Sequence, residues 1–89
     1  MKKFIFTKRT KKILLELPID IQERINSKLK LLAQDDNIFL YLKRIHCLEP
    51  ATHRLRIGDY RLLIAVQGPD TLMILKIAHR KDIYRKIAS

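Results

Sequence analysis

The sequence has 89 residues, of which 47% are hydrophobic, so it is too short for a two-domain enzyme and too apolar for a disordered chain. We therefore treat residues 1–89 as one domain with a single core. Lysines and arginines number 19 against 9 aspartates and glutamates, and the formal net charge of +10 favours a polyanionic partner, either a nucleic acid or an acidic protein.

The first predicted element is a short strand over residues 2–6, followed by Thr7 as the N-cap of a helix over residues 8–17. The opening "MKKFIFTKRTKK" begins like a secretory signal, but its apolar stretch ends at Phe6, far short of the ~7 residues that such a signal requires. The longest apolar run, residues 62–66, is too short to cross a membrane. We therefore expect a soluble protein of the cytoplasm.

A second helix is predicted after Pro18, because proline suits the first turn of a helix and disfavours continuation of the preceding one. The two helices are expected to form a hairpin whose apolar stripe is buried against the rest of the chain. The residues of this stripe recur at helical spacing and are Ile13, Leu14, Leu17, Ile21, Ile25, Leu29 and Leu32.

Residues 37–52 show no clean periodicity and are expected to be mostly irregular. Cys47 lies in this segment and is the single cysteine, so no internal disulfide can form, and the residues near it do not supply a zinc-binding set. We predict a reducing environment, with no metal and no cofactor.

Three strands are predicted in the second half, with the sequences "HRLRI", "YRLLIAV" and "TLMILKIAH". The segments between them, Gly58-Asp59 and residues 67–70, have the composition of tight turns, which favours an antiparallel meander. Residues 82–88 are predicted to form a short terminal helix. The expected fold class is therefore α+β, with an N-terminal strand, a helical hairpin packed on an antiparallel sheet of about four strands, and a short C-terminal helix.

The first turn of the meander places arginines opposite each other. If Gly58 and Asp59 form a two-residue loop, Arg56 faces Arg61, and Arg54 lies on the same face because side chains alternate along a strand. Like charges in this position destabilise a sheet by up to ~1 kcal/mol per pair. Arginine can donate two hydrogen bonds to neighbouring phosphate oxygens, so we predict an anion-binding site. The alternative is that these arginines are simply solvated and screened.

The second turn extends this face. With Val66 facing Thr71, Lys76 faces Arg61, and Arg80 joins the same face if the strand extends that far. The opposite face is expected to carry the helices and comprises Leu55, Ile57, Tyr60, Leu62, Ile64, Val66, Met73, Leu75 and Ile77. An apolar strip is left over on the arginine face, where an acidic partner would cover Leu63, Ala65, Leu72 and Ile74.

The string "RLRIGDYRLLI", followed by "IAHRKDIYR", resembles the RelE/ParE superfamily of toxins, and "TKRTKKILLELPIDIQERINSKL" matches the usual family opening in layout. The resemblance covers nearly the whole chain. RelE-like members cut messenger RNA in the decoding site of the ribosome, whereas ParE-like members inhibit DNA gyrase. Both are neutralised by an antitoxin. The resemblance therefore implies a toxin whose partners are an acidic antitoxin, the ribosome and mRNA.

The resemblance also implies site residues. Arg61 matches a residue that contacts the scissile phosphate, Arg54 and Arg80 match further basic positions, and Tyr84 matches an aromatic residue that stacks on or orients the target nucleotide. Further RNA contacts are expected from Arg56, Lys76, His79 and His53. Well-studied RelE-type proteins have lysines where this chain has Arg54 and Arg56, which leaves the proton-transfer residue open.

Cleavage of RNA without a metal needs a base, a group that stabilises the pentavalent phosphate, and an acid. Arginine suits the second task, but with a pKa above ~12 it is a poor base. The base or acid must then be His53, His79 or Tyr84, although the strand pattern places both histidines on the apolar face. The leading expectation is a metal-independent, ribosome-dependent mRNA endoribonuclease. The alternatives are a gyrase inhibitor without nuclease activity and an inactive binding module.

Overall fold

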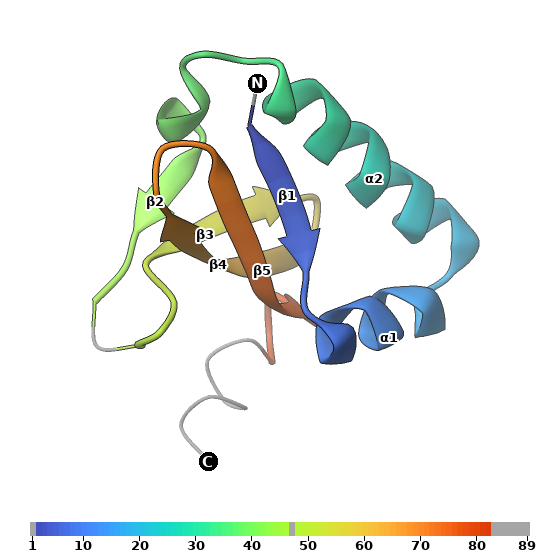
Figure 1. Ribbon diagram of the computed structural model, residues 1–89. Helices are drawn as coiled ribbons and strands as arrows, with labels where there is room; N and C mark the ends of the chain where they lie inside the picture. Colours follow the sequence, from blue (N-terminus) through green and yellow to red (C-terminus); the bar gives the residue numbers. More distant parts are fainter. Residues whose placement is uncertain (1, 47, 83–89) are drawn as a thin grey trace.

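The computed structural model describes residues 2–46 and 48–82 (Figure 1). In chain order the elements are strand β1 (Lys3–Phe6), helices α1 (Lys8–Glu16) and α2 (Ile19–Ala33), the 3₁₀ turn η1 (Ile38–Leu40), and strands β2 (Leu42–Arg44), β3 (His53–Ile57), β4 (Tyr60–Gln67) and β5 (Thr71–His79). The predicted helix over residues 82–88 lies, apart from Asp82, outside the described residues. No described helix is long and apolar enough to cross a membrane.

The helical hairpin begins and turns as its sequence predicts. The hydroxyl of Thr7 accepts a hydrogen bond from the backbone N–H of Thr10 at 3.1 Å and so caps α1. Pro18 is the N-cap of α2. The side-chain amide of Gln22 donates to the carbonyl of Leu17 at 2.7 Å, which satisfies a carbonyl at the end of α1 and ties the two helices together.

The sheet has five strands in the order β1-β5-β4-β3-β2, so the predicted α+β class is confirmed with one more strand than expected. β1 lies parallel to β5, and the other pairs are antiparallel. The additional strand, β2, lies in the segment expected to be irregular. Its three residues are too few to produce a periodic signal, and they form a strand because Leu42 pairs with Leu55 on β3.

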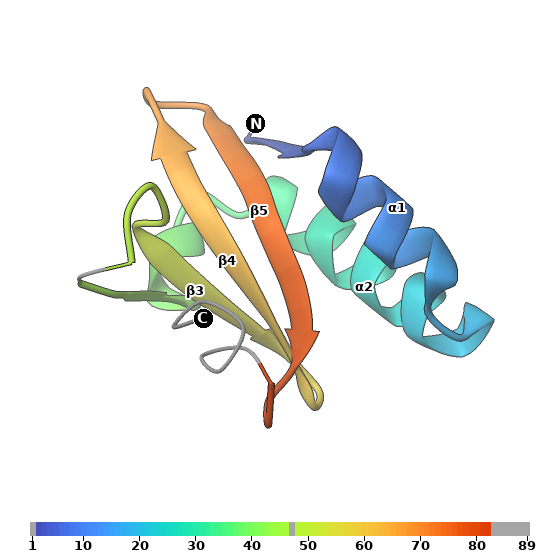
Figure 2. The same ribbon diagram turned by 90° about the horizontal axis from the view of Figure 1, so that it is seen from below.

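Both helices lie on one side of the sheet (Figure 1 and Figure 2). The core between them contains every residue of the predicted helical stripe, either buried or packed against it. It also contains Leu72 and Ile74, which are 2% and 0% exposed. Leu63 and Ala65, the other two residues of the predicted apolar strip, are buried as well, so the prediction of a strip open to a partner is wrong. Met73 and Leu75 were expected in this core and lie outside it.

These errors come from the register of the second hairpin. Gln67, and not Val66, faces Thr71, because Gly68 adopts a positive φ of 68° and allows a loop one residue shorter than expected. The one-residue shift moves the start of β5 to the other face of the sheet, which places Leu72 and Ile74 under the helices.

A β-bulge then reverses the shift. Ile64 pairs with Ile74 and Leu63 pairs with Lys76, which leaves Leu75 as an extra residue on β5. Lys76 therefore lies on the arginine face as predicted, but it faces Leu63. Arg61 faces Ala78 instead.

The face of the sheet opposite the helices, here called the open face, carries a second, smaller apolar cluster of Ala51, Leu63 and Ala78, with Ile45 and Leu75 packed against it. The loop between β2 and β3 supplies Ala51, and Thr52 fixes this loop to β4. The backbone N–H of Thr52 donates to the carbonyl of Ile64 at 2.8 Å, and its hydroxyl accepts from the N–H of Val66 at 3.1 Å.

Candidate phosphate-binding face

The strand register brings basic side chains together in two rows across the open face. One row runs from Lys43 through Arg54 and Leu63 to Lys76. The next row runs from Arg56 through Arg61 to Ala78, which confirms the predicted pairing of Arg56 with Arg61. Together with Arg80, which follows β5, the basic residues of these rows are called the cationic face: Lys43, Arg54, Arg56, Arg61, Lys76 and Arg80.

The positive charges of Arg54, Arg56 and Arg80 act on the guanidinium group of Arg61. Burial lowers the pKa of Arg61 below its ordinary value, and nearby positive charges lower it further. In decreasing order of effect, these charges belong to Arg56, Arg54 and Arg80, and Asp59 acts in the opposite direction. Arg61 remains protonated at neutral pH because an arginine pKa starts so high. The cluster therefore attracts anions.

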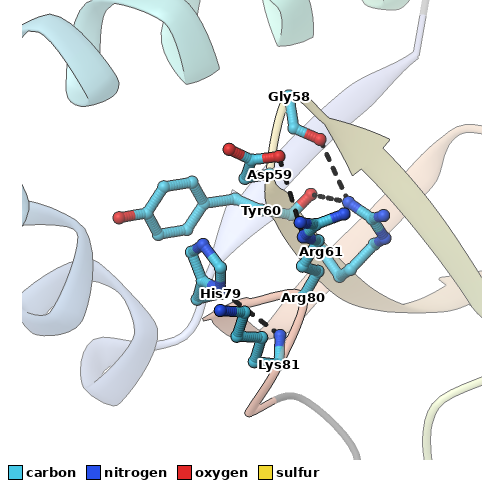
Figure 3. Close-up of polar contacts among 7 residues, drawn as sticks. All are labelled: Gly58, Asp59, Tyr60, Arg61, His79, Arg80 and Lys81. Atoms are coloured by element: carbon cyan, nitrogen blue, oxygen red, sulfur yellow. Dashed lines mark hydrogen bonds and ion pairs between the residues drawn. The ribbon is translucent and has the colours of Figure 1, made fainter.

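Backbone groups of the Gly58-Asp59 turn hold Arg61 in position. Its Nη1 atom donates to the carbonyl of Gly58 at 3.1 Å and to that of Tyr60 at 3.2 Å (Figure 3). Gly58 has a positive φ of 59°, which the turn requires and which other residues rarely adopt. The turn thus fixes the position of the arginine that follows it.

Arg80 is tied to the same turn. Its backbone N–H donates to the carbonyl of Asp59 at 2.7 Å, and its Nε atom lies 3.9 Å from a carboxylate oxygen of Asp59. These side chains are 56% and 67% exposed, so the ion pair contributes little to stability but restricts the guanidinium group to the side of Arg61 (Figure 3).

The structure does not bring His79 into the cationic face. Its ring points with that of Tyr60 to the opposite side of the turn from Arg61 (Figure 3), and the centroids of the two rings are 5.7 Å apart. The Nδ1 atom of His79 accepts from the backbone N–H of Lys81 at 3.3 Å. This arrangement holds the segment that follows β5 and carries Arg80.

His53 is also separate from the arginines. It lies on the same face of β3 as Leu55, its Nδ1 is 2.9 Å from the hydroxyl of Thr52, and its ring meets that of Phe39 at a centroid distance of 5.5 Å. Burial, and then the charge of Arg44, lower the pKa of His53 below its usual range. The imidazole is therefore neutral at physiological pH.

Of the predicted site residues, the structure brings Arg54, Arg56, Arg61, Lys76 and Arg80 onto one surface, leaves both histidines on the other, and does not describe Tyr84. Sequence reasoning missed Lys43, because the three-residue strand β2 that carries it was not predicted. Within residues 2–46 and 48–82, no three His, Cys, Asp or Glu side chains gather to form a metal site.

Comparison with known proteins identifies the family. Residues 4–84 match the family described as ParE toxin of type II toxin-antitoxin system, parDE. The toxin fold also matches a RelB-RelE antitoxin-toxin complex from Methanococcus jannaschii, at 31% identity and a TM-score of 0.70, over 92% of this chain and 96% of that one.

A second match is the toxin-antitoxin complex RelBE2 from Mycobacterium tuberculosis, at 26% identity and a TM-score of 0.62, over 89% of this chain and 98% of that one. The isolated RelE toxin of E. coli, at 15% identity and a TM-score of 0.68 over 99% and 96% of the two chains, shares the fold. No curated protein matches the sequence significantly. On the family match and these structures, the chain belongs to the RelE/ParE superfamily of toxins of type II toxin–antitoxin systems.

Proposed function

We propose that this toxin acts in the cytoplasm as a ribosome-dependent mRNA endoribonuclease that needs no metal. The observation that carries the proposal is the cationic face. The strand register places Arg54, Arg56 and Arg61 together on this face, and Arg80 lies beside the same turn, although these like charges repel one another. A bound phosphate would relieve that repulsion, and the strong field would favour the doubly charged transition state of phosphate cleavage over the singly charged ground state.

Each arginine has a distinct role in this proposal. Arg61 is held by the turn and would contact the scissile phosphate, with Arg54 and Arg80 on either side of it as electrostatic partners. Arg56 and Lys76 would contact neighbouring phosphates of the RNA. Because His53 and His79 lie on the other face of the sheet, we assign the proton-transfer role to Tyr84, whose phenolic hydroxyl can donate a proton to the leaving oxygen.

An antitoxin is the second proposed partner. The structures from Methanococcus jannaschii and Mycobacterium tuberculosis are complexes of a toxin with its antitoxin. With a net charge of +10, this chain is suited to an acidic antitoxin, and binding over the cationic face would block access of RNA.

One observation favours a second candidate function. The matching family carries the ParE name, and among the described residues the cationic face holds no histidine that could transfer a proton. A toxin of this kind would inhibit DNA gyrase through surface contacts alone. The arginines would then bind a partner without cleaving it.

Expression of the toxin without an antitoxin distinguishes these functions. We expect translation to stop, and primer extension on cellular mRNA to find cuts within translated regions. A supercoiling assay with purified gyrase is run in parallel. Intact mRNA with inhibited gyrase would establish the second candidate instead, and no effect in either assay would identify an inactive binding module. Arg61→Gln should abolish the cuts, whereas Leu15→Ala, at an exposed position on α1, should retain them.

A further inference from the structure

A small pocket opens on the open face beside the cationic face. Its volume is about 170 Å³, and it is lined by Leu48, Glu49, Pro50, Ala51, Leu63, Leu75 and Lys76. The loop between β2 and β3 forms one wall, and strands β4 and β5 form the floor and the other wall. None of these residues except Lys76 belongs to the proposed phosphate site.

The pocket is built by specific features of the fold. The bulge in β5 supplies Leu75, the extra residue that the regular pairing does not need, and Leu75 packs against the cluster of Leu63 and Ala51. Leu63 on the floor and Ala51 on the loop wall are 3% and 5% exposed, so both are held in place by packing. Thr52 fastens the loop to β4 through its hydrogen bonds to Ile64 and Val66. The apolar walls are therefore preformed.

The position of the pocket determines which ligand fits it. Leu63, on the floor, pairs with Arg54 and Lys76 on the neighbouring strands. Arg61 lies two residues before Leu63 on β4, a distance of about 6.6 Å along the strand. A molecule whose apolar part fills the pocket can thus place an attached phosphate on the arginines. A nucleotide has this combination of an apolar, planar base and a phosphate.

We propose that the pocket binds one unstacked base of the RNA strand whose phosphate lies on the cationic face. The inference rests on the proposed function and assigns a base subsite to it. Proteins that recognise single-stranded RNA commonly hold its bases in pockets after they leave the stack. Glu49 places a carboxylate among the lining residues, and it would accept a hydrogen bond from the amino group of adenine, cytosine or guanine, which uracil lacks.

The test measures binding of the full-length protein to short RNAs by fluorescence anisotropy. The RNAs are 2′-O-methylated so that they cannot be cleaved, and a single abasic nucleotide is placed at each position in turn. We expect one position at which loss of the base weakens binding by about tenfold. Uracil at that position should bind more weakly than adenine, and Glu49→Gln should reduce this preference.

Variants of the pocket and of the arginines separate the two proposals. Ala51→Leu fills the pocket and Leu75→Ala removes a wall, so each should shrink the abasic effect. Both variants are tested because the larger side chain of Ala51→Leu could displace the loop, whereas Leu75→Ala leaves the loop sequence unchanged. Arg61→Gln should weaken binding of every RNA while the abasic effect remains. Leu15→Ala is the unaffected control.

Equal binding of intact and abasic RNAs at every position would overturn the base pocket. The proposed function would still stand if Arg61→Gln weakened RNA binding and abolished cleavage. An abasic effect that persists unchanged in both Ala51→Leu and Leu75→Ala would place the base elsewhere and would also overturn the inference.

Discussion

Replacing Arg61 by glutamine separates the contribution of this residue to function from its contribution to folding. The substitution removes one of two facing charges, and removal of such a repulsion contributes up to about 1 kcal/mol in favour of the folded state. It also removes two hydrogen bonds from Nη1 to the carbonyls of Gly58 and Tyr60, each with a net value of about 0.5–1.5 kcal/mol. The carbonyl of Gly58 is solvent-accessible, and glutamine can still donate to one of the two, so the loss lies at the lower end of this range.

The two effects nearly cancel, and we expect the free energy of unfolding to change by less than about 1 kcal/mol. For a domain of this size, that corresponds to a shift in Tm below about 8 °C. Arg56→Gln is the matched control. It removes the same repulsion, but within the described part of the chain Arg56 makes no hydrogen bond or ion pair that would be lost. Arg56→Gln should therefore melt at or slightly above the parent.

RNA cleavage should respond differently from stability. Loss of one preorganised donor to the developing charge of a transition state lowers rates by about 100-fold or more, and Arg61→Gln should show a loss of this size in a cleavage assay on programmed ribosomes. Thermal melting and cleavage are measured on the same purified variants. A variant that melts far below the parent, or that cleaves at the parental rate, would refute this account of the cluster.

The remaining predictions concern the supports of the site. Burial and the charge of Arg44 lower the pKa of His53 in the folded protein, so the unfolded state binds its proton more readily. The contribution of neutral His53 to stability should be complete above about pH 6.5 and should be lost as the pH drops through the folded pKa. His53→Gln should therefore flatten the pH dependence of Tm over this range. Gly58→Ala should lower the free energy of unfolding by about 1 kcal/mol, because alanine is strained at a positive φ. Gly68→Ala also has a positive φ but has open space around it, so it should lower the free energy of unfolding by no more than Gly58→Ala, and a smaller loss at Gly58 than at Gly68 would contradict this. Thr52→Val should lower the free energy of unfolding by about 1–3 kcal/mol in a denaturant titration, because it leaves a backbone N–H of β4 without its partner, and an unchanged midpoint would show that the hydroxyl is dispensable.

Local sequence signals were sufficient for most of the fold. Thr7 and Pro18 mark the helix ends, the helical stripe marks the core, and apolar segments bounded by turn residues locate β3, β4 and β5 to within a residue at each end. The Gly58-Asp59 turn fixes its own register, since a two-residue loop has only one pairing, and this is why the pairing of Arg56 with Arg61 could be predicted.

Long-range features could not be predicted in the same way. β2 exists because β3 offers it a free edge, which no local pattern reveals. The loop of the second hairpin is rich in turn-forming residues, and whether Gln67 belongs to the strand or to the loop depends on the conformation of Gly68. That single residue decides which face of β5 packs on the helices.

The β-bulge relates the core to the site. Before the bulge, Leu72 and Ile74 point to the helices, and after it Ile77 does. A regular strand without Leu75 would keep these side chains on the helix face, because Ile74 and Lys76 would then be neighbours on opposite faces of the sheet. The core therefore does not need the extra residue. Its side chain is used instead on the open face, against Leu63 and beside Lys76, where it forms one wall of the pocket next to the arginines. Bulges commonly adjust the aim of side chains beside functional sites, and here the bulge adds an apolar surface to a cationic one without disturbing the packing of the helices.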